Sequence, residues 1–405
     1  MKSKDKVVWL INEYGTIPEN GYGGRVFYLA KNLSKAGYIV YYVVSRNHHL
    51  LNSGLSNPKH KIIDGVNVVS ISSIDYSKSR SVKRIMNWFI FNFQLLFINF
   101  IIKNKPHFIF ASSPSPFVGI PLVILSKAYS AKSCFDIRDV WPATLEALGN
   151  IKESSIAFKV MSWAEHFSIK NAEIISSNLP NLPIRINEVL GKKKKFILLP
   201  NGYDETEMLD SQPLSIDFKN NIPKDSLIVG YAGSVGIANA LEYFVEAAFK
   251  LKTSKVFFII VGEGEKLNDL KALVKHNELK NILFLPKVPK NQISSVLEIF
   301  DICYIGWQNS KLYEYGVAPN KIPEYFISGK PVLHSYSGPG DPVNLAGAGI
   351  TVPAEDPIAI ADAIELFAAT STTELANMGK KGRQFAVNNY CYKSITESLL
   401  KEISH

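Results

Sequence analysis

Residues 316–333 read Gly-Val-Ala-Pro-Asn-Lys-Ile-Pro-Glu-Tyr-Phe-Ile-Ser-Gly-Lys-Pro-Val-Leu, and this stretch decides the fold. A glycine-led loop runs into Pro319 and Asn320, which predict the start of a short amphipathic helix. Gly329 predicts the end of that helix, because glycine favours the left-handed conformation that follows a last turn. The apolar run that begins at Val332 then predicts a buried strand.

A glycine loop that opens a helix directs unpaired backbone N–H groups and the positive end of the helix dipole at one place, which suits a phosphate group. Lys321 lies beside this helix start, where an ammonium group would add to the N–H groups, although it could equally be a solvated helix residue. Glu324, about one turn further on, could accept hydrogen bonds from a diol such as ribose. An ordinary helix–strand connection remains the alternative for the isolated stretch.

The order of residues here, Y-G-x-x-P-N-K-x-x-E-Y-x-x-x-G-K-P-V, resembles the donor-site motif of retaining GT-B glycosyltransferases of family 4, in the variant found in surface-polysaccharide assembly. The wider family has two glutamates separated by seven residues. Glu324 matches the second, but Gly316 stands at the first position, and Glu314 lies two residues too early to replace it. The family's first glutamate contacts the donor sugar, so that contact is expected elsewhere or is absent.

The first half of the chain opens with a pattern typical of a Rossmann-like domain. Residues 7–11 predict a buried parallel strand, a loop ends in Gly23-Gly24-Arg25, and a helix and a second strand at residues 38–44 follow. The dinucleotide fingerprint G-x-G-x-x-G is not met, because Val26 stands at its last glycine position. The glycine pair could be a plain tight turn, but in the resembled family it lies against donor phosphates or the acceptor.

A second specific resemblance is Arg138-Asp139-Val140-Trp141-Pro142, which follows the strand predicted at residues 133–137. The same polysaccharide-assembly group has R-D-x-W-P at this place. A carboxylate, a guanidinium group and an indole at a strand end offer contacts for a sugar and an anion. Ser112 follows another predicted strand at the same edge, where doubly wound sheets bind ligands. The alternative is a structural Asp–Arg pair with a core tryptophan.

The second half restarts the strand–loop–helix pattern. Strands are predicted at residues 227–232, 256–261, 282–285 and 302–305, with glycine loops after the first two. We therefore expect an α/β protein of the GT-B class, with two Rossmann-like domains that face each other across a cleft. The expected domains are residues 1–203 and 204–387, with a C-terminal helix at residues 388–405 that packs back on the first, as in the resembled family.

Composition narrows the function classes. The three cysteines, Cys134, Cys303 and Cys391, are scattered and odd in number, which indicates a reducing compartment and argues against a zinc site. The mixed, charged residues 1–20 predict no signal peptide. Residues 1–190 hold 22 Lys and Arg against 12 Asp and Glu, a net +10, whereas the remaining 23 and 24 give −1. We expect no nucleic-acid partner, since no such motif is present, and favour anionic lipid or a phosphorylated substrate.

Residues 78–102 combine four basic residues, Lys78, Arg80, Lys83 and Arg84, with the apolar run 88–102. This run is shorter than the ~20 residues that cross a bilayer. It predicts either a core helix between strands or a basic, aromatic face that rests on the cytoplasmic leaflet of the membrane. Both hold if one side of the helix packs inward.

The resemblance implies a metal- and cofactor-independent transfer, with retention, of a sugar from a UDP-sugar to a polyprenyl-diphosphate-linked saccharide. The sugar expected is an N-acetylhexosamine or its deoxy form, and the enzyme is expected in the cytoplasm, peripheral on the inner face of the membrane. The expected catalytic residues are Asp139, Lys321 and Glu324. The expected donor contacts are Gly24, Gly233, Ser234, Gly262, Glu263, Gly316, Val317, Ala318, Asn320, Lys321 and Glu324. The expected acceptor contacts are Gly23, Arg25, Ser112, Arg138, Asp139 and Trp141.

Two alternatives remain open from the sequence. One is a UDP-N-acetylhexosamine 2-epimerase of the same fold, which would need several carboxylates and a histidine in its cleft and no acceptor surface. The other is a non-catalytic membrane adaptor that keeps the fold, an alternative supported by Gly316 in place of the family's first glutamate.

Overall fold

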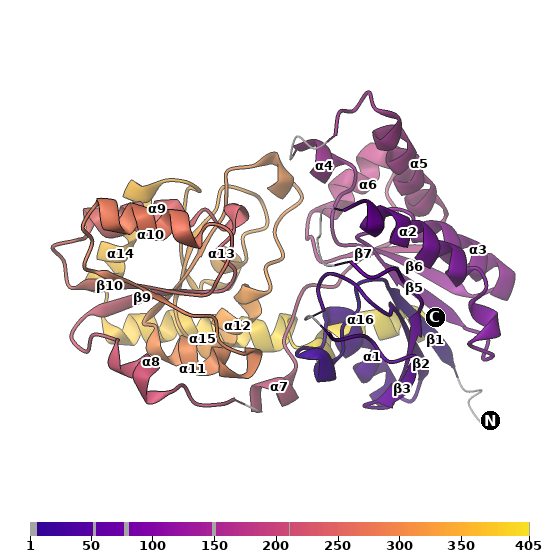
Figure 1. Cartoon of the computed structure of the whole chain (residues 1–405), viewed down its shortest axis with the longest axis horizontal. Helices are drawn as coiled ribbons and strands as arrows, with labels where there is room; N and C mark the ends of the chain where they lie inside the picture. The colour runs from indigo at the N-terminus through magenta and orange to yellow at the C-terminus, as the bar shows by residue number, and fades with distance from the viewer. Residues whose placement is uncertain (1–5, 52–53, 77–80, 148–150, 210, 405) are drawn as a thin grey trace. The chain divides into compact units, whose positions relative to one another are not determined.

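The computed structural model describes residues 6–51, 54–76, 81–147, 151–209 and 211–404. The chain folds into two compact units (Figure 1): Met1–Pro200 together with Tyr392–His405, and Asn201–Cys391. Each unit is a parallel sheet with helices on both faces, so the predicted pair of Rossmann-like α/β domains is confirmed. The domain boundaries expected from the sequence, and a cleft between the domains, stay predictions.

The first unit has an eight-stranded sheet in the described residues, in the order β3-β4-β2-β1-β5-β6-β7-β8. Its strands are parallel except for the β3–β4 hairpin. The strands are β1 (Val7–Asn12), β2 (Ile39–Ser45), β3 (His60–Ile63), β4 (Val66–Ile71), β5 (Phe108–Ser112), β6 (Lys132–Ile137), β7 (Ile174–Ser177) and β8 (Phe196–Leu198). The central strand β1 is buried along its whole length, as its continuous apolar sequence predicts.

The helices of the first unit follow the strands in alternation. They are α1 (Arg25–Lys35), α2 (Val82–Leu95), α3 (Gly119–Tyr129), α4 (Ala143–Ala147), α5 (Ile156–Asn171), α6 (Leu182–Leu190) and the C-terminal α16 (Tyr392–Ser404), with short 3-10 turns η1 (Pro18–Asn20) and η2 (Ile98–Phe100). Helix α16 belongs to this unit's core beside α1, and the Tyr28 and Tyr392 rings stack with their centroids 5.0 Å apart. The far end of the chain therefore closes the first unit's hydrophobic core.

The second unit has a six-stranded, all-parallel sheet in the described residues, in the order β11-β10-β9-β12-β13-β14. The strands are β9 (Leu227–Ala232), β10 (Val256–Val261), β11 (Ile282–Leu285), β12 (Ile302–Gly306), β13 (Val332–Ser335) and β14 (Gly349–Val352). The helical elements are α7 (Glu205–Leu209), α8 (Ile216–Asn220), α9 (Leu241–Lys250), α10 (Leu267–His276), α11 (Ile293–Ile299), α12 (Lys321–Ser328), α13 (Pro342–Ala346), α14 (Pro357–Ala369), α15 (Thr372–Asn389), η3 (Ile237–Asn239), η4 (Lys290–Gln292) and η5 (Lys311–Tyr313).

Each face of this second sheet has its own core, because successive side chains of a strand point to opposite faces. Val229 and Tyr231 of β9 pack with α9, α10 and α14. Ile228 and Ala232 of the same strand pack with α11 and α12 on the other face. Figure 1 shows these two helix layers on either side of the strands. The loops at the carboxyl ends of the strands are thereby held between two packed layers.

Helix α2 has two faces of different character. Trp88, Phe91 and Leu95 are buried, whereas Phe89 and Phe93 are 56% and 63% exposed. One side of the helix thus packs inward, as expected for a core helix, and the other presents aromatic rings to the surroundings, while its contact with a membrane stays a prediction. Lys78 and Arg80 lie outside the described residues. In the described chain, no helix combines the length and apolarity needed to cross a bilayer.

Candidate active site

Helix α12 begins where the sequence predicts, and its first turn has no side-chain cap. Asn320 occupies the N-cap position without a side-chain hydrogen bond to the helix. Gly316 adopts a φ of 91° in the preceding turn, and Gly329 ends the helix with a φ of 76°. Because a helix start leaves backbone N–H groups unpaired, this tip can bind an anion.

The Lys321 side chain lies against the glycine loop that follows β9. A Cβ atom at Gly233 would collide with Lys321 Cε, so the glycine makes room for the lysine. Lys321 Nζ lies 3.3 Å from Asn239 Oδ1 and 5.0 Å from the centroid of the Tyr231 ring. Burial lowers the pKa of the Lys321 ammonium group to about 8. The structure therefore brings Gly233, Asn239 and Lys321 together at one edge of the second sheet.

Two glycine loops at this edge are joined by backbone hydrogen bonds. Gly233 N donates to Val261 O at 2.9 Å, and Val235 N donates to Glu263 O at 2.9 Å. A Cβ at Gly262 would overlap Gly233 O, so the close approach of the loops requires glycine there. Backbone hydrogen bonding between the chains of β9 and β10 thus continues into the loops that follow these strands. Because glycines stand at the closest contacts, few side chains cover the backbone at this edge.

The remaining expected donor residues are spread over the same edge. Ser234 and Glu263 are exposed, and Glu263 forms an ion pair with Lys287. Val317 is buried, and Ala318 O accepts a 2.6 Å hydrogen bond from Asn201 Nδ2. The glycine-led loop before α12 is therefore hydrogen-bonded, through the backbone carbonyl of Ala318, to Asn201, the first residue of the second unit.

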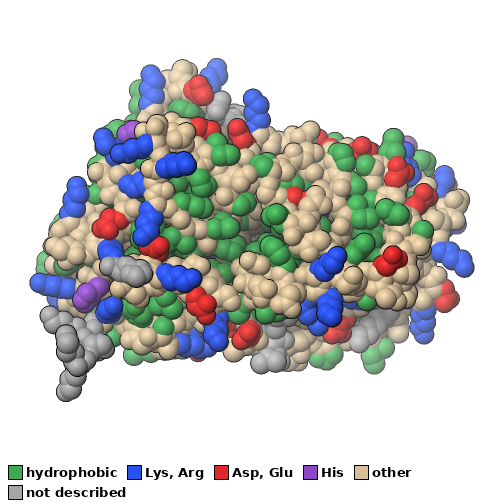
Figure 2. All heavy atoms as spheres, turned by 180° about the vertical axis from the view of Figure 1, so that it is seen from behind, with side chains coloured by type: hydrophobic (Ala, Val, Ile, Leu, Met, Phe, Trp, Pro, Cys, Tyr) green, Lys and Arg blue, Asp and Glu red, His purple; other side chains and the backbone are tan. Residues whose placement is uncertain are grey.

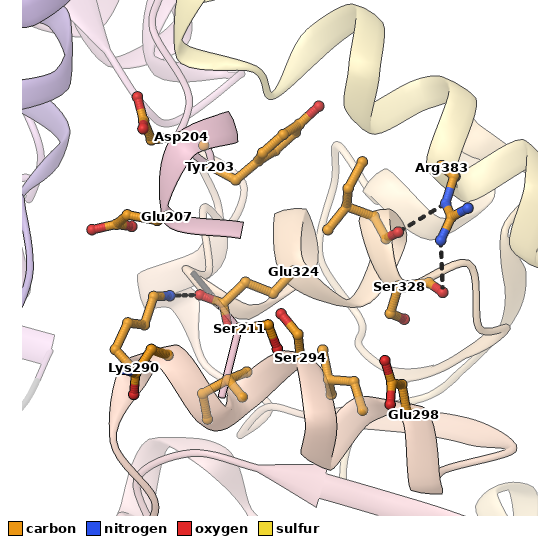
Figure 3. A pocket seen from close by; sticks show the side chains of 15 residues that line it. Tyr203, Asp204, Glu207, Ser211, Lys290, Ser294, Glu298, Glu324, Ser328 and Arg383 are labelled. Atoms are coloured by element: carbon orange, nitrogen blue, oxygen red, sulfur yellow. Dashed lines mark hydrogen bonds and ion pairs between the residues drawn. The ribbon is translucent and has the colours of Figure 1, made fainter. Parts of the chain in front are cut away.

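Glu324 points to a different neighbour from Lys321. Its Oε1 forms an ion pair with Lys290 Nζ of η4. Both side chains lie in a groove of the second unit between α11 and α12, with a cavity volume of about 310 Å³ (Figure 3). At the other end of the groove, Arg383 Nε donates to Ile327 O at 2.9 Å. We expected Glu324 to face the same mouth as Lys321; in the structure each contacts a separate loop of the sheet edge.

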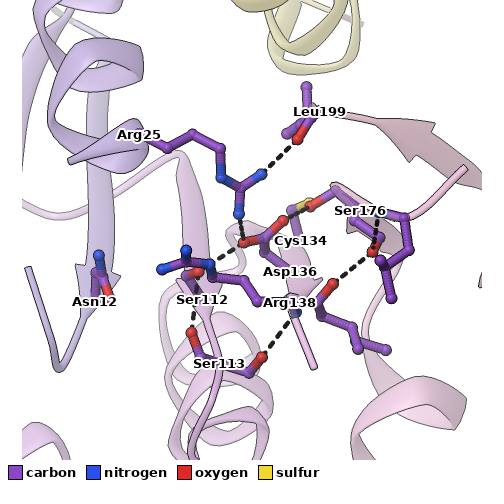
Figure 4. A network of polar contacts seen from close by, with 12 residues as sticks. Asn12, Arg25, Ser112, Ser113, Cys134, Asp136, Arg138, Ser176 and Leu199 are labelled. Atoms are coloured by element: carbon purple, nitrogen blue, oxygen red, sulfur yellow. Dashed lines mark hydrogen bonds and ion pairs between the residues drawn. The ribbon is translucent and has the colours of Figure 1, made fainter. Parts of the chain in front are cut away.

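In the first unit, two expected acceptor residues belong to a buried network around Asp136 (Figure 4). Arg25 forms an ion pair with Asp136 Oδ2 and donates to Leu199 O at 2.6 Å. Ser112 Oγ donates to Asp136 Oδ2 at 2.6 Å, and Ser176 Oγ donates to Asp136 Oδ1 at 2.9 Å. These contacts give Arg25 and Ser112 a structural role, and their acceptor role stays a prediction.

The glycine pair before α1 serves the local fold. A Cβ at Gly23 would meet the Tyr28 ring 2.5 Å from its Cζ atom. Gly24 is the N-cap of α1, with Thr16 Oγ1 3.2 Å from the place of a Cβ. Gly24 lies in the first unit and the other expected donor residues in the second, so its donor contact stays a prediction.

Asp139 and Trp141 lie beside Arg84 of α2. The Arg84 guanidinium carbon is 5.8 Å from the Trp141 ring centroid, 5.4 Å from that of Trp88 and 5.3 Å from that of Tyr14. The basic α2 residue Arg84 therefore packs inward among aromatic rings. Asp139 reaches solvent, but desolvation by the surrounding protein raises the pKa of its carboxyl against the opposing Arg138 and Arg84 charges.

Arg138 shares the loop that begins after β6, and its backbone N donates to Ser113 Oγ at 2.9 Å. This bond ties the start of the R-D-V-W-P stretch to the loop after β5. The indole Nε1 of Trp141 is buried and has no hydrogen-bond partner among the described residues. Asp139, Trp141 and Arg84 therefore form one cluster at the edge of the first sheet. The contacts within this cluster differ from those of the network around Asp136.

Glu13, which follows β1, is a residue that the sequence analysis missed. Its side chain is buried, and neither carboxyl oxygen has a partner among the described residues. Burial raises the pKa of Glu13 to about 8, and the Arg84 charge opposes that shift. Its position directly after a buried strand was a usable signal. Asn239, Asp136 and Lys290 were also missed, since no local pattern marks their distant partners.

Groups of three or more His, Cys, Asp or Glu side chains placed to bind a metal ion are absent from the described part of the chain. The three cysteines are buried and unbridged.

Comparison with known proteins relates the chain to glycosyltransferases. Residues 214–385 match the family described as glycosyl transferases group 1. The chain is 21% identical over 272 residues to the probable glycosyltransferase WbjE of Pseudomonas aeruginosa, covering 66% of each chain. It is 24% identical over 234 residues to the putative colanic acid biosynthesis glycosyl transferase WcaI of Escherichia coli, covering 56% of each. The alignments thus span two thirds or less of these relatives.

Solved structures extend the likeness over the whole fold. Sucrose-phosphate synthase from Thermosynechococcus elongatus has a TM-score of 0.75 at 16% identity and 98% coverage of both chains. HepE from Anabaena, in complex with UDP and glucose, has a TM-score of 0.67 at 12% identity, covering 98% of this chain and 99% of that one. At these identities the likeness concerns the fold, which is GT-B. Residues 214–385 thus match a glycosyl transferases group 1 domain, the curated relatives are named as glycosyltransferases, and the whole chain has the GT-B fold.

Proposed function

We propose that this glycosyltransferase moves a sugar from a UDP-sugar to a polyprenyl-diphosphate-linked saccharide, with retention of configuration, in bacterial surface-polysaccharide synthesis. The observation that carries the proposal is the uncapped start of α12 with Lys321 beside it, in the space that Gly233 leaves. An amine and unpaired N–H groups at one strand edge suit a diphosphate. The neighbours HepE and the Escherichia coli trehalose-6-phosphate protein were solved with UDP and UDP-2-fluoro glucose respectively, which supports a UDP-sugar donor here.

The chemical step is stabilisation of the leaving group. As the glycosidic bond breaks, negative charge grows on the diphosphate, and Lys321 with the α12 N–H groups offsets it. The leaving phosphate oxygen accepts the proton of the attacking hydroxyl, so the transfer balances without a separate base. Glu324 binds the ribose of the donor, and Asp139 orients a sugar. Because Lys321 has a pKa of about 8, a bound diphosphate would favour its charged form.

The proposed acceptor site is the cluster of Asp139, Trp141 and Arg84 in the first unit. Aromatic rings and a carboxylate are suited to a saccharide, and the net charge of +10 in residues 1–190 (22 Lys and Arg minus 12 Asp and Glu) is suited to a diphosphate carrier. Figure 2 shows Lys and Arg side chains spread over one face of the molecule, with hydrophobic side chains between them. The colanic acid assignment of WcaI supports a polysaccharide pathway. The transferred sugar we propose is an N-acetylhexosamine or its deoxy form.

We also propose that the outer face of α2 and η2 rests on the cytoplasmic leaflet. The exposed large side chains of this stretch are Val82, Ile85, Met86, Phe89, Phe93, Leu96, Phe97, Phe100 and Ile101, and the exposed Lys83, Lys103 and Lys105 lie nearby in the chain. An exposed apolar face with basic residues nearby is typical of interfacial membrane contact. Sedimentation with phosphatidylglycerol vesicles tests this, because the F89E/F93E variant should stay in solution while the I358E control, at an exposed site of α14, should bind as the wild type does.

The experiment for the reaction is a panel of UDP-sugars offered with a detergent-solubilised polyprenyl-diphosphate-linked monosaccharide. We expect one N-acetylated or deoxy-N-acetylated sugar to be transferred and the new linkage to keep the donor's configuration. Absence of both UDP binding and transfer across the panel would contradict the proposal. The epimerase alternative is not favoured, since the relatives have glycosyltransferase names. It predicts that the UDP-sugar alone gives its epimer, whereas the transferase gives slow hydrolysis at most.

A further inference from the structure

Lys290 occupies a place in the second unit that no sequence motif marks. Strand β11 ends at Leu285, and its loop leads into η4, whose first residue is Lys290. Glu324 lies in the first turn of α12, which packs against α11. Both residues therefore lie near the carboxyl edge of the sheet, where parallel α/β sheets bind ligands. Figure 3 shows the two side chains directed toward each other at one end of the groove.

The ion pair engages half of the Glu324 carboxylate. Lys290 Nζ lies closest to Oε1, so Oε2 is the carboxylate oxygen further from the lysine. The Glu324 side chain is 23% exposed, so its second oxygen can be reached by a ligand in the groove. A carboxylate whose one oxygen is held by an ammonium group loses rotational freedom and presents the other oxygen in a fixed direction.

Stability alone does not account for this contact. The Lys290 side chain is 45% exposed, and an ion pair between exposed groups contributes between zero and about 1 kcal/mol. A second carboxylate, Glu207 of α7, also acts electrostatically on Lys290. The lysine is thus placed between two acidic side chains of the same groove, and its specific contact is with the one at the sheet edge.

Resting on the function proposed above, we propose that Lys290 is a positioning residue of the donor site: it holds Glu324 so that Oε2 accepts a hydrogen bond from a ribose hydroxyl of the nucleoside diphosphate. Lys290 touches the carboxylate and does not touch the nucleotide. Its effect is therefore confined to the contact between Glu324 and the ribose.

The test is a calorimetric titration of the full chain with UDP, 2′-deoxy-UDP and 3′-deoxy-UDP. In the wild type we expect UDP to bind roughly tenfold more tightly than at least one deoxy analogue, the usual effect of one hydrogen bond to a charged group. K290M should weaken UDP several-fold, leave that deoxy analogue unchanged, and so reduce the discrimination to about twofold. K290R, which keeps the cation, should restore most of it, and K275M on α10 should behave as the wild type.

Three results overturn the inference, and they differ from one another. If UDP does not bind the wild type, the proposed function fails as well. If UDP binds but neither deoxy analogue is discriminated, the contact between Glu324 and the ribose is absent. If K290M keeps the full discrimination, or weakens UDP and the deoxy analogues equally, the lysine supports the groove without orienting Glu324, and the proposed function stands.

Discussion

The two sheets end in loops of the same kind, but their polar side chains are used differently. At the edge of the first sheet, Arg25, Ser112 and Ser176 satisfy one another through Asp136, which is fully buried. At the edge of the second sheet, two loops have glycine in place of larger side chains, and Lys321, the first residue of an uncapped helix, extends its side chain against Gly233. In the first sheet the charged groups are paired with one another inside the protein. In the second sheet the ammonium group of Lys321 and the N–H groups of the helix start are placed where a ligand could bind them.

This difference shows that residue type and strand-end position alone do not identify a binding group. Arginine and serine at a strand end can be parts of a scaffold, and glycine can be the feature that opens a site. The Asp139, Trp141 and Arg84 cluster stands between these extremes, because its aromatic rings pack together while Asp139 reaches solvent. The predictions below test the two edges in turn.

The largest effect is expected from D136A in the first unit. Removal of the carboxylate leaves Arg25 as an uncompensated buried charge, which should lower the free energy of unfolding by about 3–5 kcal/mol. Urea denaturation followed by circular dichroism measures this. D269A, which breaks the exposed Lys266–Asp269 pair, should leave the free energy of unfolding almost unchanged. A stable D136A variant with lost acceptor use would instead make the network part of the binding site.

The K321A variant should have the opposite profile. Loss of the ammonium group beside the diphosphate should reduce kcat by about 10²–10³, the range found when one preorganised charge-stabilising donor is removed. Acceptor KM and thermal stability should change little, because the amine has a hydrogen-bond contact with Asn239 alone among the described residues. K380A at an exposed site of α15 is the matched control. Unchanged turnover in K321A would assign the counter-charge to another group.

A substitution of the buried Glu13 tests whether the edge of the first sheet tolerates an ionised carboxylate. Its pKa of about 8 in the folded chain lies above the ordinary value of 4.5, so the folded state binds the proton more tightly than the unfolded state does. The wild type should therefore lose stability relative to E13Q as pH rises from about 5 to about 8, by about 3 kcal/mol. Thermal unfolding of both proteins across this range measures it, with E19Q as an exposed control. A difference that is independent of pH would contradict a buried, protonated Glu13.

The smallest effect is expected from E324A. Loss of the ribose contact should raise donor KM about tenfold and lower turnover modestly, while acceptor KM stays constant. Initial-rate kinetics with each substrate varied in turn separates these terms. E298A, a carboxylate at the other end of the same groove, serves as control. Donor kinetics equal to those of the wild type would remove Glu324 from the donor site.

Much of the fold could be predicted because apolar periodicity is local. Strands β9, β10 and β11 begin and end at the residues expected from their apolar runs. The β3–β4 hairpin was missed, although Asp64-Gly65 between the strands is a strong turn signal and both residues have positive φ angles of 47° and 78°. Strand β3 is short and mostly exposed, so its apolar pattern was weak.

The candidate site was predicted in part for the same physical reason. The start of α12 and the end at Gly329 follow from local chemistry, and both are confirmed. The partners of the charged side chains do not follow from local chemistry, because which side chains meet depends on how the helices pack. Arg25 and Asp136 are 111 residues apart, and the Glu324–Lys290 pair forms across two helices. No spacing rule in the sequence contains that information.

The central claim is that Lys321 and the start of α12 bind the diphosphate of the donor. The most direct measurement is calorimetric binding of UDP and uridine at about pH 7 and pH 9. We predict that UDP binds at least about 100-fold more tightly than uridine at pH 7, and that this ratio falls about tenfold by pH 9, because Lys321, with a pKa of about 8, loses its proton over that interval. Equal affinities for UDP and uridine, or a ratio that does not change with pH, would contradict the account.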